Sequence, residues 1–337
     1  MASHPMATTA LPFTVIGGYL GAGKTTLLNR MLAQASGLRL AVLVNDFGDL
    51  NIDAALVRRH AGDTIELANG CLCCSLVSGF AEALSQVKAH AESFDQVVIE
   101  ASGVAEPLRV AQMAQGFGLP VDGMLVVVDA EQIERQAADR YVGDVVRRQL
   151  RQADLLLVNK LDRITADQHA VLHERLEALA PGVPRLEMVQ GDVPLALLLG
   201  LHRGRGLPSS LSQPLPEADA AGANQRHDER FDTWTLRCDR PLSRLQLERF
   251  AAGLGPGIYR AKGFVALAED PGRRQLFQQV GQRWTLEPAD VWGDDAPATA
   301  LVVIGRRGAT SSGALQDLLE SGQALTGPPA GVGLHRH

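Results

Sequence analysis

The sequence predicts an α/β protein with a mostly parallel sheet flanked by helices, followed by a smaller α+β C-terminal domain. Three observations carry this prediction. Short, nearly continuous apolar runs alternate with helix-like segments as far as residue 202. A glycine-rich loop separates the first apolar run from the first helix-like segment. After a stretch rich in glycine, proline, serine and alanine, the pattern changes to alternating polar and apolar residues.

The first part of the chain contains six apolar runs without polar alternation, which is typical of parallel strands covered on both faces. These expected strands are 13–17, 39–45, 96–100, 123–129, 154–160 and 185–189. Helix-like segments connect them as crossovers. The expected helices are 25–35, 77–90, 107–115 and 166–179.

The second part of the chain has the pattern of an antiparallel sheet. In FDTWTLRC, Trp234, Leu236 and Cys238 fall on one face of a strand that is buried on that side alone. Four later segments resemble further strands and two resemble helices. The expected organisation is 11–202 for the first domain, 203–229 for a linker, 230–325 for the second domain and 326–337 for a disordered tail.

Composition excludes several classes of protein. A formal net charge of −6 without a long basic run argues against a nucleic-acid partner. The longest apolar runs are far too short to span a membrane, and the first residues lack a charged leader with an apolar core. We therefore expect a cytoplasmic protein with no membrane partner. Four cysteines in such a chain do not form a disulfide framework, which leaves metal binding, redox chemistry or burial.

The segment GYLGAGKTT, residues 18–26, matches the phosphate-binding pattern G-x-x-x-x-G-K-[ST] and lies between an expected strand and an expected helix. This is the arrangement of a P-loop NTPase, in which backbone N–H groups and a helix N-terminus meet the phosphates. Lys24 is expected at the β and γ phosphates and the Thr25 hydroxyl on Mg²⁺. The expected nucleotide contacts in this loop are Gly18, Gly21, Ala22, Gly23, Lys24, Thr25 and Thr26.

A second motif favours GTP over ATP. The strand expected at 154–160 ends in NKLD, residues 159–162, at the edge where ligands bind in such sheets. The carboxylate of Asp162 can accept hydrogen bonds from the N1 and N2 donors of guanine, whereas adenine would leave it unpaired. Asn159 and Lys160 complete the predicted guanine site.

Two further segments are candidate switches that respond to the nucleotide. NDFGDLNID, residues 45–53, carries Asp46, Asp49 and Asp53, which can approach Mg²⁺, a hydrolytic water or a second metal, or can form a solvated acidic loop. IEASGVAEP, residues 99–107, offers Glu100 near Mg²⁺ and the Gly103 N–H for the γ phosphate. The candidate catalytic residues are Lys24, Thr25, Asp46 and Glu100, and slow intrinsic hydrolysis is expected because no glutamine is placed to orient water.

Cys71, Cys73 and Cys74 form C-x-C-C directly after an Asn-Gly turn signal. Three thiolates converging on one ion suit Zn²⁺ or Co²⁺, and this interpretation is favoured. A redox pair of Cys71 and Cys74 has the C-x-x-C spacing but does not explain Cys73, and simple burial in a turn fits less well. Asp49, His60 or water are candidates for a fourth ligand, which would give a site that can load and release its ion.

Taken together, GGYLGAGKTTLLNRML, VNDFGDLNID, IELANGCLCCSL, VVIEASGVAEP and LLLVNKLD resemble the CobW-like GTPases, the metallochaperone branch of the SIMIBI P-loop proteins related to HypB and UreG. IYRAKGFVALAED and TALVVIG look like the CobW C-terminal domain. The resemblance implies GTP-dependent delivery of zinc or cobalt to a client metalloprotein. The chain departs from many relatives at Val44, where they have glutamate, and at Asp46 and Asp49, where they have glutamates.

The sequence therefore predicts a GTPase that converts GTP to GDP and phosphate, uses Mg²⁺, and binds Zn²⁺ or Co²⁺ at Cys71, Cys73 and Cys74 for a client metalloprotein. A homodimer is a candidate assembly. Two alternatives stay open: a GTP- and metal-binding regulator of metal homeostasis that transfers no metal, and a P-loop kinase with a structural zinc.

Overall fold

The computed structural model describes residues 11–35, 38–44, 76–199, 230–293 and 295–321. By their contacts the residues group into two compact units, Met1–Arg230 with Val280–Arg283, and Phe231–Gln279 with Trp284–His337. Each unit has its own sheet and its own hydrophobic core.

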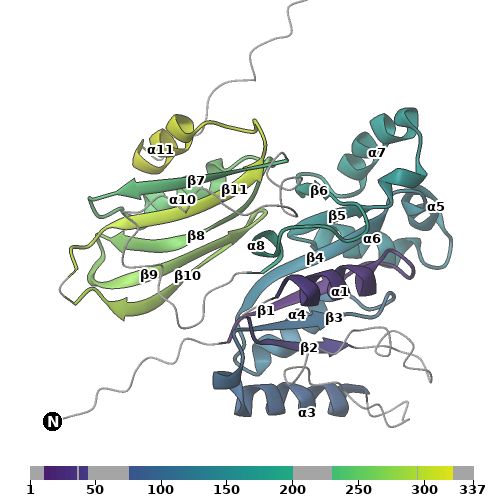
Figure 1. Cartoon of the computed structure of the whole chain (residues 1–337), viewed down its shortest axis with the longest axis horizontal. Helices are drawn as coiled ribbons and strands as arrows, with labels where there is room; N and C mark the ends of the chain where they lie inside the picture. Colours follow the sequence, from purple (N-terminus) through teal and green to yellow (C-terminus); the bar gives the residue numbers. More distant parts are fainter. Residues whose placement is uncertain (1–10, 36–37, 45–75, 200–229, 294, 322–337) are drawn as a thin grey trace, which may run out of the picture. The chain divides into compact units, whose positions relative to one another are not determined.

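The sheet of the first unit is parallel throughout the described residues, with strand order β2-β3-β1-β4-β5-β6 (Figure 1). Its strands are β1 (Phe13–Gly17), β2 (Leu40–Val44), β3 (Gln96–Glu100), β4 (Val121–Asp129), β5 (Leu155–Asn159) and β6 (Arg185–Glu187). Every residue of β1, β3, β4 and β5 is buried, as expected for strands covered on both faces. The predicted parallel α/β fold is confirmed.

Helices cover this sheet and complete two clusters of buried side chains. The helices of the first unit are α1 (Lys24–Gln34), α3 (Leu76–Ala89), η1 (Ala91–Ser93), α4 (Pro107–Gly116), α5 (Ile133–Ala138), α6 (Gly143–Gln152), η2 (Leu161–Arg163), α7 (Ala166–Leu179) and α8 (Leu195–Leu198). One cluster joins α3 and α4 to β1, β2 and β3, and the other joins α5, α6 and α7 to β4 and β5. Met124 belongs to the first cluster and Val126 and Val128 to the second, so both clusters lie on one face of the sheet.

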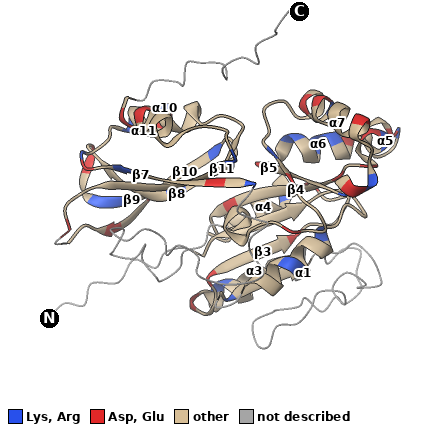
Figure 2. Ribbon diagram, turned by 45° about the horizontal axis from the view of Figure 1, so that its top comes forward, with Lys and Arg blue, Asp and Glu red and all other residues tan. Residues whose placement is uncertain are grey.

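The second unit packs two helices on one face of an antiparallel sheet (Figure 2). Its strands are β7 (Phe231–Cys238), β8 (Ile258–Leu267), β9 (Asp270–Val280), β10 (Arg283–Val291) and β11 (Thr299–Arg306), in the order β10-β9-β8-β11-β7, and its helices are α10 (Arg244–Gly253) and α11 (Ser312–Ser321). Leu236 and Cys238 on β7 are buried, whereas Thr235 and Arg237 are exposed. The predicted one-sided burial of this strand and the core position of Cys238 are confirmed.

Three α-helices of the first unit were not among those expected from the sequence, α5, α6 and the four-residue α8, nor were the short helices η1 and η2. Polar and charged residues dominate α6, and its buried positions are limited to Gly143, Val146, Gln149 and Leu150. These positions have helical spacing and lie on one face, so the sequence did contain a signal for this helix although few of its residues are apolar. The helices and strands that were expected in the first unit agree with the structure to within two residues at each end.

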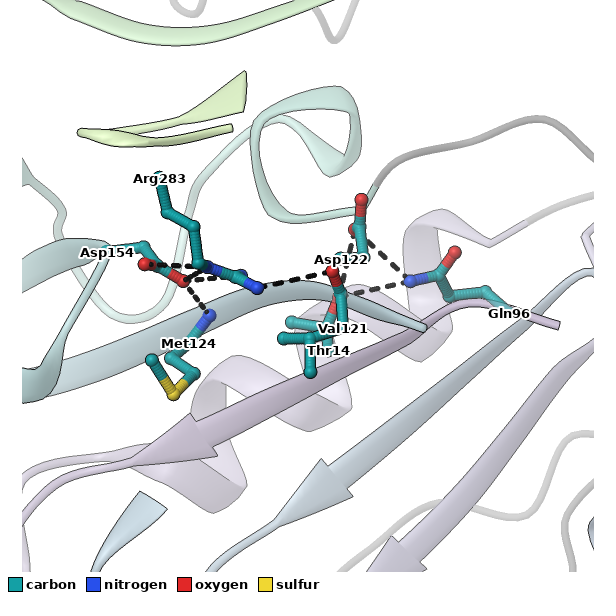
Figure 3. Close-up of polar contacts among 7 residues, drawn as sticks. All are labelled: Thr14, Gln96, Val121, Asp122, Met124, Asp154 and Arg283. Atoms are coloured by element: carbon teal, nitrogen blue, oxygen red, sulfur yellow. Dashed lines mark hydrogen bonds and ion pairs between the residues drawn. The ribbon is translucent and has the colours of Figure 1, made fainter. Parts of the chain in front are cut away.

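Buried polar side chains lie at the amino ends of four strands of the first unit (Figure 3). Gln96 donates to Thr14 Oγ1 at 3.1 Å and to Asp122 Oδ2 at 3.2 Å. Asp154 lies directly before β5, and its Oδ2 accepts a hydrogen bond of 2.6 Å from the Met124 N–H. The same carboxylate forms an ion pair with Arg283, whose Nε and Nη2 lie 2.9 and 2.6 Å from Asp154 Oδ2. Burial raises the pKa of the Asp154 carboxyl, and the Arg283 guanidinium opposes that shift.

Candidate nucleotide-binding site

The loop between β1 and α1 has the backbone conformation that a phosphate cradle needs. Gly18 and Gly23 have φ values of 128° and 109°, which disfavour any residue with a Cβ. A Cβ on Gly18 would lie 2.3 Å from the Val127 carbonyl oxygen, and one on Gly23 would lie 2.4 Å from the Asn159 Nδ2. The loop is therefore fitted closely against Val127 within β4 and Asn159 at the end of β5, and α1 begins directly after it at Lys24.

Lys24 curls back over this loop. Its Nζ donates to the Gly18 carbonyl oxygen at 3.0 Å and approaches that of Tyr19 at 3.5 Å, and the residue is only 8% exposed. This fold-back holds a positive charge above backbone groups at the start of an 11-residue helix, where the helix dipole also favours an anion. Of the other predicted loop contacts, Gly21 and Thr26 are exposed and Ala22 is buried with its N–H directed to the Tyr19 carbonyl at 3.2 Å.

The structure brings Thr25 and Glu100 together although 75 residues separate them. The Thr25 hydroxyl donates to Glu100 Oε1 at 3.4 Å, and Glu100 is 3% exposed at the end of β3. A hydroxyl and a carboxylate beside a phosphate cradle form the oxygen-rich donor set that Mg²⁺ prefers. These two residues fit the ion that a nucleoside triphosphate carries.

The segment after β3 packs against the phosphate loop. A Cβ on Gly103 would lie 2.7 Å from the Leu20 backbone nitrogen. The side chain of Gln149 on α6, 1% exposed, donates to the Gly103 and Ala105 carbonyl oxygens at 3.0 and 2.7 Å. Gln149 is thus a positioning residue for the candidate γ-phosphate segment, and no local sequence signal marked it.

The end of β5 presents the three residues of the predicted guanine motif. Asn159 Nδ2 donates to the Ala22 carbonyl oxygen at 2.9 Å, so this side chain also braces the phosphate loop. Its Oδ1 is buried and has no hydrogen-bond partner among the described residues. Lys160 has φ of 62° and forms an ion pair of 2.7 Å with Asp129 Oδ2, and Asp162 lies exposed on η2.

Asp129 is a second residue that the sequence prediction missed. It is 3% exposed at the end of β4 and its Oδ1 accepts the Glu131 N–H at 3.0 Å. By holding the Lys160 side chain it supports the left-handed backbone from which the Asp162 segment begins. Its place at the carboxyl end of an expected strand was the signal that could have identified it.

Several predicted residues lie outside the described residues. They are Asp46, Asp49, Asp53, His60, Cys71, Cys73 and Cys74. The predictions for the first switch and for the thiolate site therefore remain predictions.

Four features lie together at the carboxyl ends of β1, β3, β4 and β5. They are a loop lined with glycines, a lysine that folds back over it, a helix N-terminus and a threonine–glutamate pair. Together they define a P-loop nucleotide-binding protein. The profile of the CobW/HypB/UreG nucleotide-binding domain matches residues 12–187, and the profile of the cobalamin synthesis protein CobW C-terminal domain matches residues 231–322. The chain belongs to the CobW/HypB/UreG family.

Curated relatives match over nearly the whole chain. The chain is 33% identical to a zinc chaperone CobW of Pseudomonas aeruginosa, over 90% of this chain and 89% of that protein. It is 29% identical to the zinc chaperone YjiA of Escherichia coli, over 87% of this chain and 93% of that protein. Among solved structures, Zn(II)-bound YjiA GTPase from E. coli covers 94% of this chain and 99% of its own, with 22% identity and a TM-score of 0.42.

No helix in the described part of the chain combines the length and the apolar character needed to cross a membrane.

Proposed function

We propose that this protein is a GTP-dependent metallochaperone that binds zinc or cobalt at Cys71, Cys73 and Cys74 and delivers it to a client metalloprotein. The observation that carries the nucleotide half of the proposal is the joining of Thr25 to Glu100 beside the cradle of Gly18–Lys24. The names of the relatives, zinc chaperones and zinc-regulated GTPase metalloprotein activators, support the metal half.

In this proposal each residue of the nucleotide site has a defined task. Backbone N–H groups of the loop and the start of α1 bind the phosphates, and Lys24 leaves its carbonyl partners to meet the β and γ oxygens. Thr25 and Glu100 would hold Mg²⁺, and the ion would supply positive charge for the phosphoryl group that is transferred. Asp162 accepts hydrogen bonds from guanine, and the Gly103 N–H contacts the γ phosphate on a segment held by Gln149.

The metal is the cargo of this cycle. The C-x-C-C motif lies in the sequence between the first candidate switch and β3, whose last residue is Glu100. Contacts to the γ phosphate that order those segments can therefore also change the affinity of the thiolates for their ion. By linkage, the metal must change the affinity for GTP by the same factor.

The test is the affinity for Zn²⁺ and Co²⁺ measured with GDP and with a non-hydrolysable GTP analogue. We expect the two nucleotides to give different metal affinities in the native chain, and the difference to vanish when Cys71, Cys73 and Cys74 are all changed to serine. Cys238→Ser is the matched control, since this buried cysteine belongs to the core of the second unit. Equal metal affinities in the two nucleotide states would refute the coupling.

Delivery is tested separately, by following the ion from the loaded protein to apo-proteins recovered with it in the GTP-bound state. Transfer that depends on GTP hydrolysis supports a chaperone. Retention of the ion in the presence of every recovered protein would instead identify a metal-responsive regulator.

A further inference from the structure

Two histidines and a glutamate converge on the outer edge of the first unit, apart from the residues assigned above. His169 and His173 lie one turn apart on α7, and Glu187 is the last residue of the edge strand β6. The Nε2 atoms of His169 and His173 lie 2.8 and 2.7 Å from the same atom, Glu187 Oε1. The ligand atoms of all three side chains lie within 4.8 Å of one another.

We propose that His169, His173 and Glu187 form a second binding site for a divalent transition metal such as Zn²⁺ or Co²⁺. Two neutral imidazoles and one carboxylate are a ligand set that suits these ions, and three protein ligands leave a position for water or an incoming group. The site goes beyond the proposed function, because none of its residues belongs to the nucleotide site or to the cysteine motif.

The geometry requires only small adjustments to accept an ion. Bonds of about 2.1 Å at tetrahedral angles place ligand atoms about 3.4 Å apart. The present N···O separations of 2.7 and 2.8 Å must therefore open by about 0.6–0.7 Å. All three side chains are partly exposed, between 36% and 42%, so they can move and an ion can reach them.

The backbone beneath the histidines is well fixed. Spacing of four residues places both imidazoles on one face of α7. Thr165 and Gln168 form a capping box at the start of this helix, and Leu172 and Leu176 anchor it in the core. The two rings meet edge to face with centroids 5.2 Å apart, so neither stacks over the other's nitrogen atoms.

The local charge favours a cation. Arg185 is the one basic side chain of β6, two residues before Glu187, and its guanidinium pairs with Glu177 and donates to the His173 carbonyl oxygen. Because Arg185 pairs with Glu177, its positive charge is balanced there. The negative charge of Glu187 is then next to the two imidazoles and available to a bound cation. Acidic residues also occur along α7, as Figure 2 shows, and the one arginine of this helix, Arg175, pairs with Glu134 at 3.7 Å.

The site lies at the same edge of the sheet as the guanine motif. Glu187 pairs with Val158, directly before Asn159, and the Met188 N–H donates to the Val158 carbonyl oxygen at 2.8 Å. The chain reaches His169 seven residues after Asp162. An ion at this site would therefore join α7 to β6 next to the segment that we expect to bind the base.

The test uses the full-length, tag-free chain with Cys71, Cys73 and Cys74 changed to serine, titrated with Co²⁺ and with Zn²⁺. We expect one remaining site per chain, with a Co²⁺ absorption spectrum that lacks thiolate-to-metal bands. Either His169→Ala or His173→Ala should weaken it by at least about 100-fold, since loss of an outer-shell partner alone costs about 10–100-fold. His90→Ala is the matched control, because His90 is exposed and its Nδ1 contacts only the Gln86 carbonyl among the described residues.

A second measurement covers the case in which the cysteine variant does not fold. In the native chain, the double variant His169→Ala, His173→Ala should bind one equivalent of metal fewer than the parent, and His335→Ala with His337→Ala should not. Metal binding that is unchanged by the α7 variants would overturn this site without touching the cysteine proposal. Loss of nucleotide-dependent affinity with this site intact would refute the proposed function alone.

Discussion

The two ends of the same four strands are used in different ways. At the amino ends of β1, β3 and β4, the side chains of Thr14, Gln96 and Asp122 form hydrogen bonds with one another (Figure 3). Directly before β5, Asp154 pairs with Arg283. At their carboxyl ends the strands lead into the phosphate loop, Glu100, Asp129 and Asn159. There the polar groups hold loops, and the buried Asn159 Oδ1 has no partner among the described residues.

The amino-end side chains bond mainly to one another across strands, and the carboxyl-end side chains bond mainly to loops. The two ends do not differ in whether every buried acceptor is satisfied, because Gln96 Oε1 at the amino end also has no partner among the described residues. Buried polar atoms are normally satisfied within the protein, as Asp154 is by four hydrogen bonds. At the carboxyl edge, where ligands bind in open parallel sheets, the phosphate loop, Glu100, Asp129 and Asn159 lie together, and this grouping is what indicates a site. Substitutions at the two ends should therefore have different consequences.

The largest effect is expected from Arg283→Met at the amino end. The Asp154 carboxylate would lose its cation while staying buried, which should reduce the free energy of unfolding of the first unit by about 3–5 kcal/mol. Chemical unfolding checks this, and nucleotide affinity of the folded fraction should not change. Arg39→Met is the control, because the Arg39–Asp95 pair is half-exposed at its arginine and should contribute about 1 kcal/mol or less.

The same variant has a defined dependence on pH. Burial already raises the pKa of Asp154, and removal of Arg283 leaves that shift unopposed. When the pKa of a carboxyl is raised in the folded state, the free energy of unfolding falls as the pH rises above the pKa of the unfolded chain. The reason is that the folded state must then hold the ionised carboxylate in a buried place. The deficit of Arg283→Met should thus be smaller near about pH 4 than at pH 7. An equal deficit at both values would contradict the assignment.

Lys24→Ala should have the next largest effect, at the carboxyl end. Loss of a charged donor to the phosphates should weaken GTP binding by about 100-fold or more, equivalent to about 2.7 kcal/mol. Fluorescent-nucleotide titration measures it, and the unfolding midpoint without nucleotide should change little. Lys88→Ala, on the exposed side of α3, should bind GTP as the native chain does.

Asp162→Asn tests the choice of base. An amide group opposite the guanine N1 and N2 donors should cost about 2 kcal/mol, or roughly thirtyfold in affinity for GTP. Xanthosine triphosphate presents a carbonyl in place of the N2 amino group. Its affinity for the Asp162→Asn variant should fall less than that of GTP, or should rise. Asp167→Asn, five residues further on in the first turn of α7, is the control. If GTP and ATP bind equally well to the native chain, the guanine assignment fails.

Gln149→Leu should have the smallest effect on binding. The Gly103 and Ala105 carbonyls would lose their shared donor, which should destabilise that segment by about 1–3 kcal/mol. We expect kcat for hydrolysis to fall more than the affinity for GDP, because the segment is proposed to contact the γ phosphate alone. Gln152→Leu on the same helix is the control, and an unchanged kcat for Gln149→Leu would argue against this positioning role.

Much of the site could be predicted because its parts are local. The phosphate loop, the strand ends and the guanine motif each consist of a few neighbouring residues whose spacing follows from backbone geometry. The six parallel strands were identifiable for a similar reason, since continuous burial selects apolar residues along each of them. The thiolate motif and the first switch are equally local, and their roles remain predictions.

Other parts could not be predicted from local patterns. Gln149 reaches Gly103 across 46 positions and Arg283 reaches Asp154 across 129, and in both cases the partner is chosen by how the chain folds. His169, His173 and Glu187 converge only because α7 returns alongside β6. A lone histidine on a helix gives no sign of the glutamate that it will meet.

The sequence by itself determined the family, the parallel sheet and the chemistry of the phosphate loop, because each depends on short-range spacing and on which residues can be buried. The tertiary structure decided which polar groups pair. It brought Arg283 to Asp154 and Glu100 to Thr25, and it buried Asn159 Oδ1 at the carboxyl edge of the sheet. Such choices depend on contacts between segments far apart in the chain. Their free energy comes from desolvation and pairing in the folded state, which no short segment records.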